Sequence, residues 1–529
     1  MKTVITYCLL LFALPLWAQN HQHSLPSWQL PCGSSTEKHE FLREYQRAPF
    51  LYQNNLSRSP NTVYLPISLH LIGRNDSSSA VALQSVLASF CRLNEDYQRS
   101  DIQFFIQFPI RYHYSDSMYS HDSVTYGGRF MLTHNVANTI NVYFVASPAG
   151  NCGYNLPYAG IAMNNGCLGG HTFAHEMGHA LGLPHTFLGW EGGVSWDNSI
   201  QPNFNAPAPR RVTYNYTNFK DTIWTDTLII DTTETELVAR TGSAANCATA
   251  ADGFCDTEAD YLAYRWLCDN NNFSTVRQLD ADSVSFFSDG KYIMSYASDN
   301  CQSVFSAEQR TFMQTFIANR RQSYLYNQNP NTAVINSPAN LIFPNGTAAV
   351  AQTNIAFTWA AVPNATHYLL ELYREPYASN TIIKTVLLTD TQFIFNGQLP
   401  PRPAIFPYAW RVQPFNEGYT CTGFGNVINF NTFVPASVDN INAVESFNIY
   451  PNPSINGASV RLEIVTNKEN LNGFIKIYNS IGQIVSYLPA ALYAGANLFS
   501  INSYDFAAGI YWVEYADDNG SLIKKWVNN

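Results

Sequence analysis

Three histidines and one glutamate near the middle of the chain are the residues best suited to chemistry. His175 and His179 are four positions apart, so on a helix their imidazoles project from one face and can bind one ion. Glu176 lies on the same turn, where its carboxylate can take a proton from a metal-polarised water. Gly182 can adopt a positive φ angle and end the helix, which lets His185 turn back as a third ligand. Three histidines leave one zinc position open, as in catalytic rather than structural zinc sites.

The alternative interpretation of this motif is an accidental spacing of core or surface histidines. Only 12 histidines occur in the chain, so a match at all five positions is hard to obtain by chance. We therefore predict a zinc-dependent hydrolytic centre in which the metal polarises a substrate carbonyl and Glu176 acts as general base.

The pattern around the motif predicts a mixed sheet backed by helices. Residues 172–183 form the helix that carries the histidines, and an amphipathic helix over 80–97 precedes it. Ser306 and Gln309 form a capping box at the start of a third helix. Strands are predicted at 62–72, 102–108 and 140–146, with a short edge strand at 159–163.

Several short motifs follow one another in order along residues 60–325. They are LNEDY from Leu93 to Tyr97, HEMGHALGLPHTF from His175 to Phe187, Cys255-Asp256-Thr257, Met294 to Cys301, and Phe305 to Gln309. As a set they resemble the pappalysin family of metzincin metallopeptidases, especially its secreted bacterial branch related to ulilysin and cytophagalysin. Two positions depart from the family pattern, because Pro184 replaces a common aromatic residue and Ser295 a common Asp. Neither is a metal ligand.

The resemblance implies an α/β catalytic domain over 61–328, with a cleft between two subdomains and endopeptidase activity. It also implies that Met294 forms the Met-turn beneath the metal and that Tyr296 assists the developing oxyanion. Without the resemblance, Met294 would be read as core filling and Tyr296 as a packing aromatic.

Two further functions follow from the resemblance. Asp252, Asp256 and Thr257 lie in a segment that corresponds to a calcium-binding region of the family, with an acidic solvated loop as the alternative. Cys32 lies in the presumed leader, and relatives use such a cysteine as a switch that occupies the open zinc position and keeps the zymogen inactive.

The amino-terminal residues predict export. Lys2, an apolar run from Val4 to Leu16 and the small residue Ala18 indicate a signal peptide over 1–18. Residues 19–60 are polar and turn-rich, without sustained periodicity, and we interpret them as a leader or propeptide.

Nine cysteines remain once the signal peptide is removed. Most should be oxidised outside the cytosol, and the odd number leaves at least one thiol free or paired between chains. Cys32, Cys91 and Cys421 are all eligible as that thiol. The favoured disulfides are Cys152–Cys167 and Cys268–Cys301, with Cys247–Cys255 as a further candidate.

Two all-β modules are predicted to follow the catalytic domain. Residues 335–433 show short alternating strands, such as Phe357 to Trp359 and Tyr408 to Trp410, and resemble a fibronectin type III or immunoglobulin-like sandwich. Residues 445–529 resemble the type A sorting domain of type IX secretion. That resemblance rests on Ile449 to Pro453, Ile475 to Ile484, Ala508 to Val513 and Lys524 to Val527. A plain β-sandwich without a transport role is the alternative.

Composition limits the classes of partner. Only 13% of residues are charged, the net charge is -10, and no basic run occurs, so the sequence argues against nucleic-acid binding. Past the signal peptide, no apolar stretch approaches the ~18 residues of a membrane helix. The sequence thus predicts a secreted or surface-attached zinc endopeptidase that acts on proteins or peptides and contacts the type IX machinery. A non-catalytic surface adhesin that retains a metal site is the competing class.

Cleavage preference is open at this stage. Asp299 or Asn300, just past the Met-turn, could line the pocket on the primed side of the scissile bond. An acidic floor there would favour Arg or Lys substrates.

Overall fold

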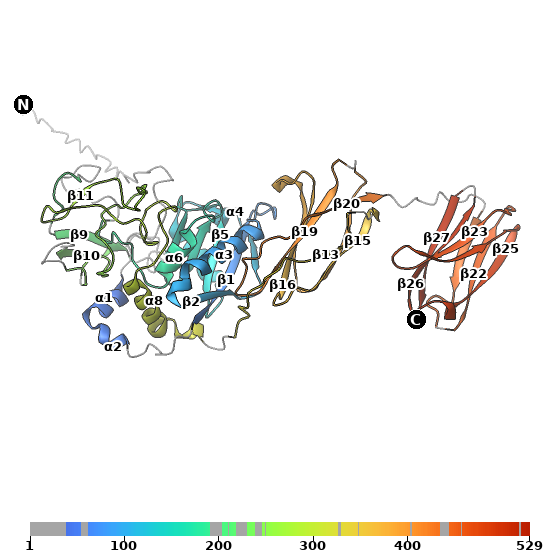
Figure 1. Cartoon of the computed structure of the whole chain (residues 1–529), viewed down its shortest axis with the longest axis horizontal. Helices are drawn as coiled ribbons and strands as arrows, with labels where there is room; N and C mark the ends of the chain where they lie inside the picture. The colour runs from blue at the N-terminus through green and yellow to red at the C-terminus, as the bar shows by residue number, and fades with distance from the viewer. Residues whose placement is uncertain are drawn as a thin grey trace, which may run out of the picture.

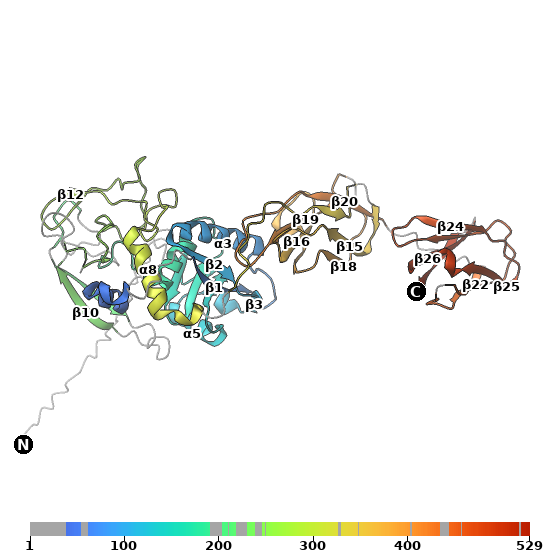
Figure 2. The same cartoon turned by 60° about the horizontal axis from the view of Figure 1, so that its bottom comes forward.

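The computed structural model describes most of the chain as three domains. The described residues are 39–53, 62–190, 204–209, 211–217, 230–237, 246–248, 250–325, 329–346, 349–402, 405–433, 444–455, 457–517 and 520–529. An α/β domain contains residues 62–325, and β-sandwiches occupy 329–433 and 444–529. Figures 1 and 2 both show the first sandwich between the α/β domain and the last sandwich. The predicted signal peptide and most of the predicted leader lie outside the described residues.

The α/β domain is built on a mixed six-stranded sheet. The strand order is β2-β1-β5-β8-β7, and β3 pairs with the far end of β1. All neighbouring pairs are parallel except β7 with β8. The central strands are buried along almost their whole length, as expected for a parallel sheet covered on both faces. The strands are β1 (Val63–Gly73), β2 (Ile102–Ile106), β3 (Arg111–Tyr114), β5 (Ile140–Val145), β7 (Gly153–Leu156) and β8 (Gly160–Asn164).

One predicted strand has a different place in the sheet. The segment expected as an edge strand at 159–163 is β8, and it lies between β5 and β7. The chain folds back just before it, so β7 pairs antiparallel with β8 and forms the edge. A hairpin of this kind is not distinguishable from a single edge strand by polarity alone, because both of its strands are largely buried.

Helices pack against the sheet and against each other. In α3 (Leu83–Tyr97) the buried residues follow the predicted apolar stripe, although the helix begins at Leu83 rather than Ala80. At α8 (Ala307–Arg320) the Ser306 Oγ accepts from the Gln309 backbone N–H at 3.1 Å, and the Ser306 N–H donates to Gln309 Oε1 at 3.0 Å, which is the predicted capping box. The other helices here are α4 (Asp116–Tyr119), α5 (Val124–His134), α6 (Thr172–Ala180) and the 3-10 turns η1 (Gln98–Ser100) and η3 (Gln322–Leu325).

Short strand pairs occupy the region around and after α6. The two members of each pair are β4 (Ser120–His121) with β6 (Ser147–Pro148), β9 (Arg211–Thr217) with β10 (Ile230–Leu237), and β11 (Gln278–Leu279) with β12 (Ser285–Phe286). The antiparallel pair β9–β10 lies between α6 and the segment that carries the predicted calcium residues.

Part of the predicted leader is a folded element. Residues 40–47 form α1 (Glu40–Arg47), and α2 (Pro49–Gln53) follows directly. The Phe41 ring packs edge-on against Phe316 at 5.5 Å, and the Glu44 carboxylate pairs with Arg320 at 2.7 Å. The expectation of no regular structure across 19–60 was therefore wrong for these residues. A helix of two turns is too short to give a clear periodic signal, and its contact with α8 stabilises it.

Four disulfides join the described cysteines. Cys152–Cys167, Cys247–Cys255 and Cys268–Cys301 are the pairs suggested by the sequence. Cys91 pairs with Cys421 across 330 positions, so neither is the unpaired thiol. Both had been eligible, because sequence alone cannot show that two such distant residues are neighbours. Cys8 and Cys32 lie outside the described residues.

In the first sandwich, two sheets of mostly antiparallel strands pack face to face. One sheet has the order β13-β15-β18 and the other β14-β20-β19-β16-β17, with β14 and β20 parallel. Alternating large residues fill the space between them, including Phe357 and Trp410 at 5.1 Å. The elements are β13 (Leu341–Phe343), β14 (Ala349–Ala351), β15 (Thr353–Trp359), β16 (His367–Arg374), η4 (Ser379–Thr381), β17 (Ile382–Leu388), β18 (Gln392–Gln398), β19 (Tyr408–Phe415) and β20 (Ile428–Phe433).

This sandwich is joined tightly to the α/β domain. Leu370 and Leu372 on β16 face its own core, whereas Leu369, on the opposite face, is buried in the core of the α/β domain. The Ile106 N–H of edge strand β2 donates to the Glu417 carbonyl at 2.8 Å. The sandwich therefore covers one edge of the six-stranded sheet, and the Cys91–Cys421 bond secures the contact.

The last sandwich has a three-stranded and a four-stranded sheet, in the orders β21-β22-β25 and β24-β23-β26-β27. The residues between them form a separate core centred on Trp526 and Val513. The elements are β21 (Val444–Tyr450), β22 (Ser459–Thr466), β23 (Phe474–Tyr478), β24 (Ile484–Pro489), β25 (Gly495–Asn502), η5 (Ser503–Asp505), β26 (Gly509–Asp517) and β27 (Gly520–Asn528). Across the described residues of the whole chain, no helix is both long and apolar enough to span a bilayer.

Candidate metal centre

Helix α6 is held in place by contacts at both ends. The Tyr97 hydroxyl of α3 donates to the Ala174 carbonyl at 3.1 Å, and His171 Nδ1 lies 2.9 Å from the Asp96 carboxylate. The helix ends at Ala180, earlier than the predicted 183, because Gly182 adopts a φ of +87°. This turn reverses the chain after α6 and brings the third histidine back toward the first two.

The three histidines of the motif come together, and hydrogen bonds fix the ring tautomers of two of them. Nδ1 of His175 donates to the Ile293 carbonyl at 2.7 Å, and Nδ1 of His179 donates to the Leu183 carbonyl at 2.8 Å. A carbonyl only accepts, so in both rings Nδ1 carries the proton and Nε2 keeps its lone pair. Nε2 of His179 lies 3.1 Å from Nε2 of His185. The ligand atoms of all three lie within 4.8 Å of one another.

These residues fit a zinc ion. Two nitrogens bound tetrahedrally at the usual zinc distance are about 3.3 Å apart, close to the spacing of His179 and His185. Nε2 of His175 is buried without a hydrogen-bond partner among the described residues, a costly arrangement that a metal would relieve. Burial lowers the pKa of His175 to about 4 and the pKa values of His179 and His185 well below the usual range. All three are therefore neutral near pH 7, which metal binding requires.

Glu176 is fully buried beside the histidines and lies against the edge strand β7. A Cβ atom added to Gly153, the first residue of β7, would lie 2.7 Å from the Glu176 Cγ and 2.9 Å from its Oε1. Only glycine leaves room for the carboxylate here. This contact could not be predicted from the sequence, because no pattern links the glutamate to a glycine 23 positions before it.

Met294 contacts helix α6, and Tyr296 lies beside His185. Met294 is buried, and its sulfur fills the space that a side chain at Gly178 of α6 would need. The Tyr296 ring is buried 4.9 Å from the ring of His185. Gln302, which sequence reasoning missed, donates to the carbonyls of Ile293 and Ser295 at 3.3 and 2.8 Å. The Gln302 amide thus holds the segment whose Ile293 carbonyl accepts the hydrogen bond from His175.

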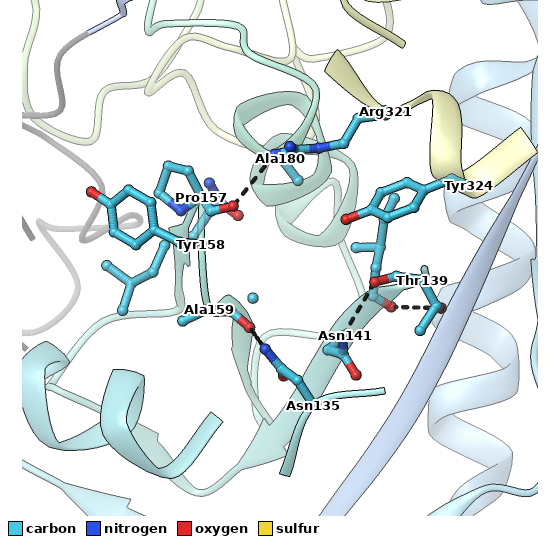
Figure 3. Close-up of a pocket in the computed structure, with 13 residues that line it drawn as sticks. Asn135, Thr139, Asn141, Pro157, Tyr158, Ala159, Ala180, Arg321 and Tyr324 are labelled. Carbon is cyan, nitrogen blue, oxygen red and sulfur yellow. Dashed lines mark hydrogen bonds between the residues drawn. The ribbon is translucent and has the colours of Figure 1, made fainter. Parts of the chain in front are cut away.

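The turn between β7 and β8 is anchored from two sides, as Figure 3 shows around a small polar pocket. Asn135 donates to the Ala159 carbonyl at 2.5 Å, and the Arg321 guanidinium donates to the Pro157 carbonyl at 3.3 Å. None of the three metal-centre histidines lines this pocket. The hydrogen bonds from Asn135 and Arg321 fix the hairpin whose first residue, Gly153, lies against Glu176.

The predicted acidic specificity pocket has a different electrostatic character. The Asp299 carboxylate pairs with Arg265 at 2.9 Å, and a side chain at Gly170 would collide with it. The guanidinium offsets the charge that was expected to attract Arg or Lys substrates. The sequence could not show this, because Arg265 lies 34 positions away on another loop.

The predicted calcium segment is tied into the protein by its own side chains. Thr257 Oγ1 donates to the buried Asp252 carboxylate at 2.7 Å. Asp256 accepts from the Glu308 N–H at 2.8 Å, at the start of α8, where a carboxylate is favoured. These bonds give both acids a structural role, and calcium binding stays a prediction.

The described part of the leader begins at His39, directly before α1. Burial lowers the pKa of His39 to about 3. Cys32 itself lies outside the described residues.

A buried acid that the sequence did not single out supports the third histidine. Asp260 accepts from Thr186 Oγ1 and from Ser288 Oγ, both at 2.7 Å. Thr186 directly follows His185, so this carboxylate fixes the chain that carries the ligand. An isolated Asp in an irregular segment carries no motif by which it could have been found.

Comparison with known proteins identifies the last domain. Residues 448–529 match the family described as the secretion system C-terminal sorting domain. This match supports a type IX sorting tail, which points to export to the outer membrane or cell surface and to contact with the secretion machinery. A search of curated proteins finds no match.

Many solved structures show similarity to parts of this chain, and three are described here. The fibronectin type III domain of the human collagen alpha-1(XX) chain is 19% identical over 21% of this chain and 94% of that chain, with a TM-score of 0.15. The chicken CNTN1 FN1-FN3 domains are 10% identical over 37% and 65%, with a TM-score of 0.17. The BSP domain of a biofilm associated protein is 12% identical over 36% and 29%, with a TM-score of 0.15. At such TM-scores, the sandwich architecture rests on the strand order described above.

Proposed function

We propose that this chain is an exported zinc-dependent endopeptidase of the pappalysin type. The observation that carries the proposal is the convergence of three buried, neutral histidines, two of them with fixed tautomers, with Glu176 buried on the same turn of α6. A structural zinc site has four protein ligands, whereas this cluster offers three among the described residues.

His175, His179 and His185 would hold the zinc through Nε2. When bound, the zinc would supply a Lewis acid that polarises the scissile carbonyl and lowers the pKa of water. Glu176 accepts the proton of the attacking water and returns it to the leaving amine. Burial of Glu176 against Gly153 keeps the carboxylate in one orientation for both transfers.

Tyr296 and β7 act on the substrate in this proposal. The Tyr296 hydroxyl donates a hydrogen bond to the oxygen on which charge develops. Strand β7 is an edge of the sheet, so its outer backbone groups can pair with an extended peptide laid beside Glu176. Such pairing selects an extended segment of a protein chain and supports endopeptidase activity.

Two regulatory elements belong to the same proposal. Cys32 would bind the open zinc position and keep the chain latent, and the packing of leader helix α1 on α8 supports a leader held against this domain. Cys32→Ala should then raise the activity of the unprocessed chain, and unchanged latency would contradict the switch.

Asp252, Asp256 and Thr257 would bind calcium, which should raise the melting temperature of the protein. A melting temperature unchanged by calcium would contradict that site.

The competing function, a surface adhesin with a vestigial metal site, has less support. A binding protein has no need of a buried carboxylate beside the ligands, because burying an unused acid costs free energy. No contact in the described residues favours an adhesin over a peptidase.

The proposal is tested by hydrolysis of a quenched peptide library by the chain freed of its leader, with a chelator and after zinc is added back. We expect cleavage that the chelator abolishes and zinc restores. Cleavage that persists without metal would contradict the proposed chemistry. A folded, zinc-loaded chain that cleaves nothing would favour the adhesin.

A further inference from the structure

The two outer faces of the last sandwich differ in character. Paired residues of an antiparallel sheet share a face, so the register gives the rows of side chains that point outward. On the four-stranded sheet one row reads Ile484, Tyr478, Trp512 and Lys525. The adjacent positions Ile475, Ile477 and Val513 point inward to the core, which confirms the direction of this row.

The next row on the same face has a similar composition. It contains Tyr487, Lys476, Glu514 and Ile523. Large apolar side chains are left open to solvent in both rows, with Trp512 44% and Tyr487 57% exposed. We call this surface of the β24-β23-β26-β27 sheet the aromatic face.

The opposite outer face is mostly polar. On the three-stranded sheet one row reads Tyr450, Arg461 and Ser500, and the next reads Asn448, Glu463 and Leu498. A cluster of exposed large apolar side chains that includes a tryptophan is typical of binding surfaces. The two rows of the aromatic face hold four such residues, Ile484, Tyr487, Trp512 and Ile523, whereas the two rows of the polar face hold two, Tyr450 and Leu498.

We infer that the aromatic face is the surface by which this chain docks on a protein of the type IX secretion machinery, and that the partner offers an apolar patch bordered by carboxylates. The family match already assigns a sorting role to residues 448–529 but names no surface. Lys476 and Lys525 lie beside the aromatic residues, and the Glu514 carboxylate accepts from the Tyr478 hydroxyl at 2.5 Å, so two cations face outward with their acidic neighbour engaged. Opposite charge on the partner would complement them.

A lipid surface is a weaker occupant. Glu514 lies in the middle of the aromatic face, and inserting a carboxylate into hydrocarbon is costly. A protein partner can leave Glu514 hydrogen-bonded to Tyr478 and still cover Trp512.

The test is the distribution of the full-length chain between periplasm and exterior in cells that carry the machinery. The variant Trp512→Ser/Tyr487→Ser is compared with the matched control Tyr450→Ser/Leu498→Ser on the polar face. We expect the ratio of exported to periplasmic chain to fall about tenfold or more in the first variant and to stay unchanged in the control, the loss typical of an aromatic hot spot. The charge-reversal variant Lys476→Glu/Lys525→Glu should also be retained in the periplasm. Equal export of all variants, or equal retention of the control, would overturn the inference.

Two measurements on purified full-length protein separate docking from other causes. The Trp512→Ser/Tyr487→Ser variant should stay folded and melt within a few degrees of the wild type, because about half of each side chain is already exposed. Loss of the cooperative melting transition would attribute the export loss to misfolding and overturn the inference. Sedimentation with phosphatidylethanolamine–phosphatidylglycerol vesicles should show no binding that depends on Trp512. Binding that does would assign the face to lipid instead.

Discussion

The chain contains two β-sandwiches of similar build that differ in how they relate to the rest of the molecule. The first shares a core with the α/β domain through Leu369 and Phe415 and is bonded to it by Cys91–Cys421. The second has its own core, and long-range hydrogen bonds such as Ser454 to Asn528 close it on itself. Its aromatic face is left open.

This difference separates two roles. A sandwich that covers sheet edge β2 and shares buried side chains is part of the folding unit that positions the metal centre. A sandwich with a separate core and an exposed apolar face is suited to act as a sorting signal that a partner protein recognises. Changes in the first should alter stability and activity, and changes in the second should alter export alone.

Truncation gives the largest predicted contrast. A chain ending at residue 443 should keep the melting temperature and zinc content of the α/β domain. A chain ending at 329 exposes β2 and the residues that Leu369 and Phe415 cover, so it should fail to fold or aggregate. Expression followed by thermal melting checks both. If the shorter chain melts like the longer one, the two sandwiches do not differ as described.

A single methyl group at the metal centre should affect activity and spare export. Gly153→Ala forces the Glu176 carboxylate aside, and a displacement of this size costs about 10²-fold in kcat. Gly169→Ala is the matched control, because nothing lies within 4 Å of an added Cβ there. Zinc content and export should equal wild type in both variants. Full activity of Gly153→Ala would show that Glu176 is not confined by β7.

The disulfide between domains should matter more than a local one. Cys91→Ser/Cys421→Ser opens a loop of 330 positions, which costs about 2–5 kcal/mol of stability in the chain-entropy model. Cys152→Ser/Cys167→Ser opens a loop of only 15 positions and should cost less. Denaturant unfolding of the chain ending at 443 measures both losses. Equal losses would argue against the long-range bond as the main fastening of the first sandwich.

The smallest predicted effect is a pH dependence at the domain junction. The His367 ring stacks on Phe108 at 3.8 Å, and burial lowers the pKa of His367 below 6.5, although Glu417 opposes the shift. Below pH 6.5 the unfolded chain therefore binds the proton more readily, so stability is full above that pH and falls as the pH drops. His367→Phe should flatten this fall in melting temperature. No histidine occurs in 444–529, so the last sandwich should not show this histidine-linked loss of stability at low pH.

Sequence reasoning succeeded where a signal was local. The helix carrying His175 and His179 and the capping box at Ser306 depend on residues a few positions apart. It failed where tertiary contacts between distant segments decide the outcome. Cys91 with Cys421, Arg265 with Asp299 and Gly153 with Glu176 are pairs of this kind, and no periodic pattern records them.

The described part of the leader is another case in which contacts between distant segments decide the structure. Phe41 and Leu42 are ordinary apolar residues in a polar stretch, and only packing against α8 makes their helix stable. The aromatic face also needed the strand register, because Trp512 can be assigned to the outside only when Tyr511 and Val513 are known to point inward.

The most direct test of the central claim compares peptide hydrolysis by the wild-type chain and by Glu176→Gln, both freed of the leader and loaded with equal zinc. The amide keeps the size of the side chain but cannot accept the proton of the attacking water. We predict that the variant binds one zinc and that its hydrolysis falls by at least about 10²-fold, within the range that general-base catalysis contributes. Cleavage at the wild-type rate by the zinc-loaded variant would contradict the account.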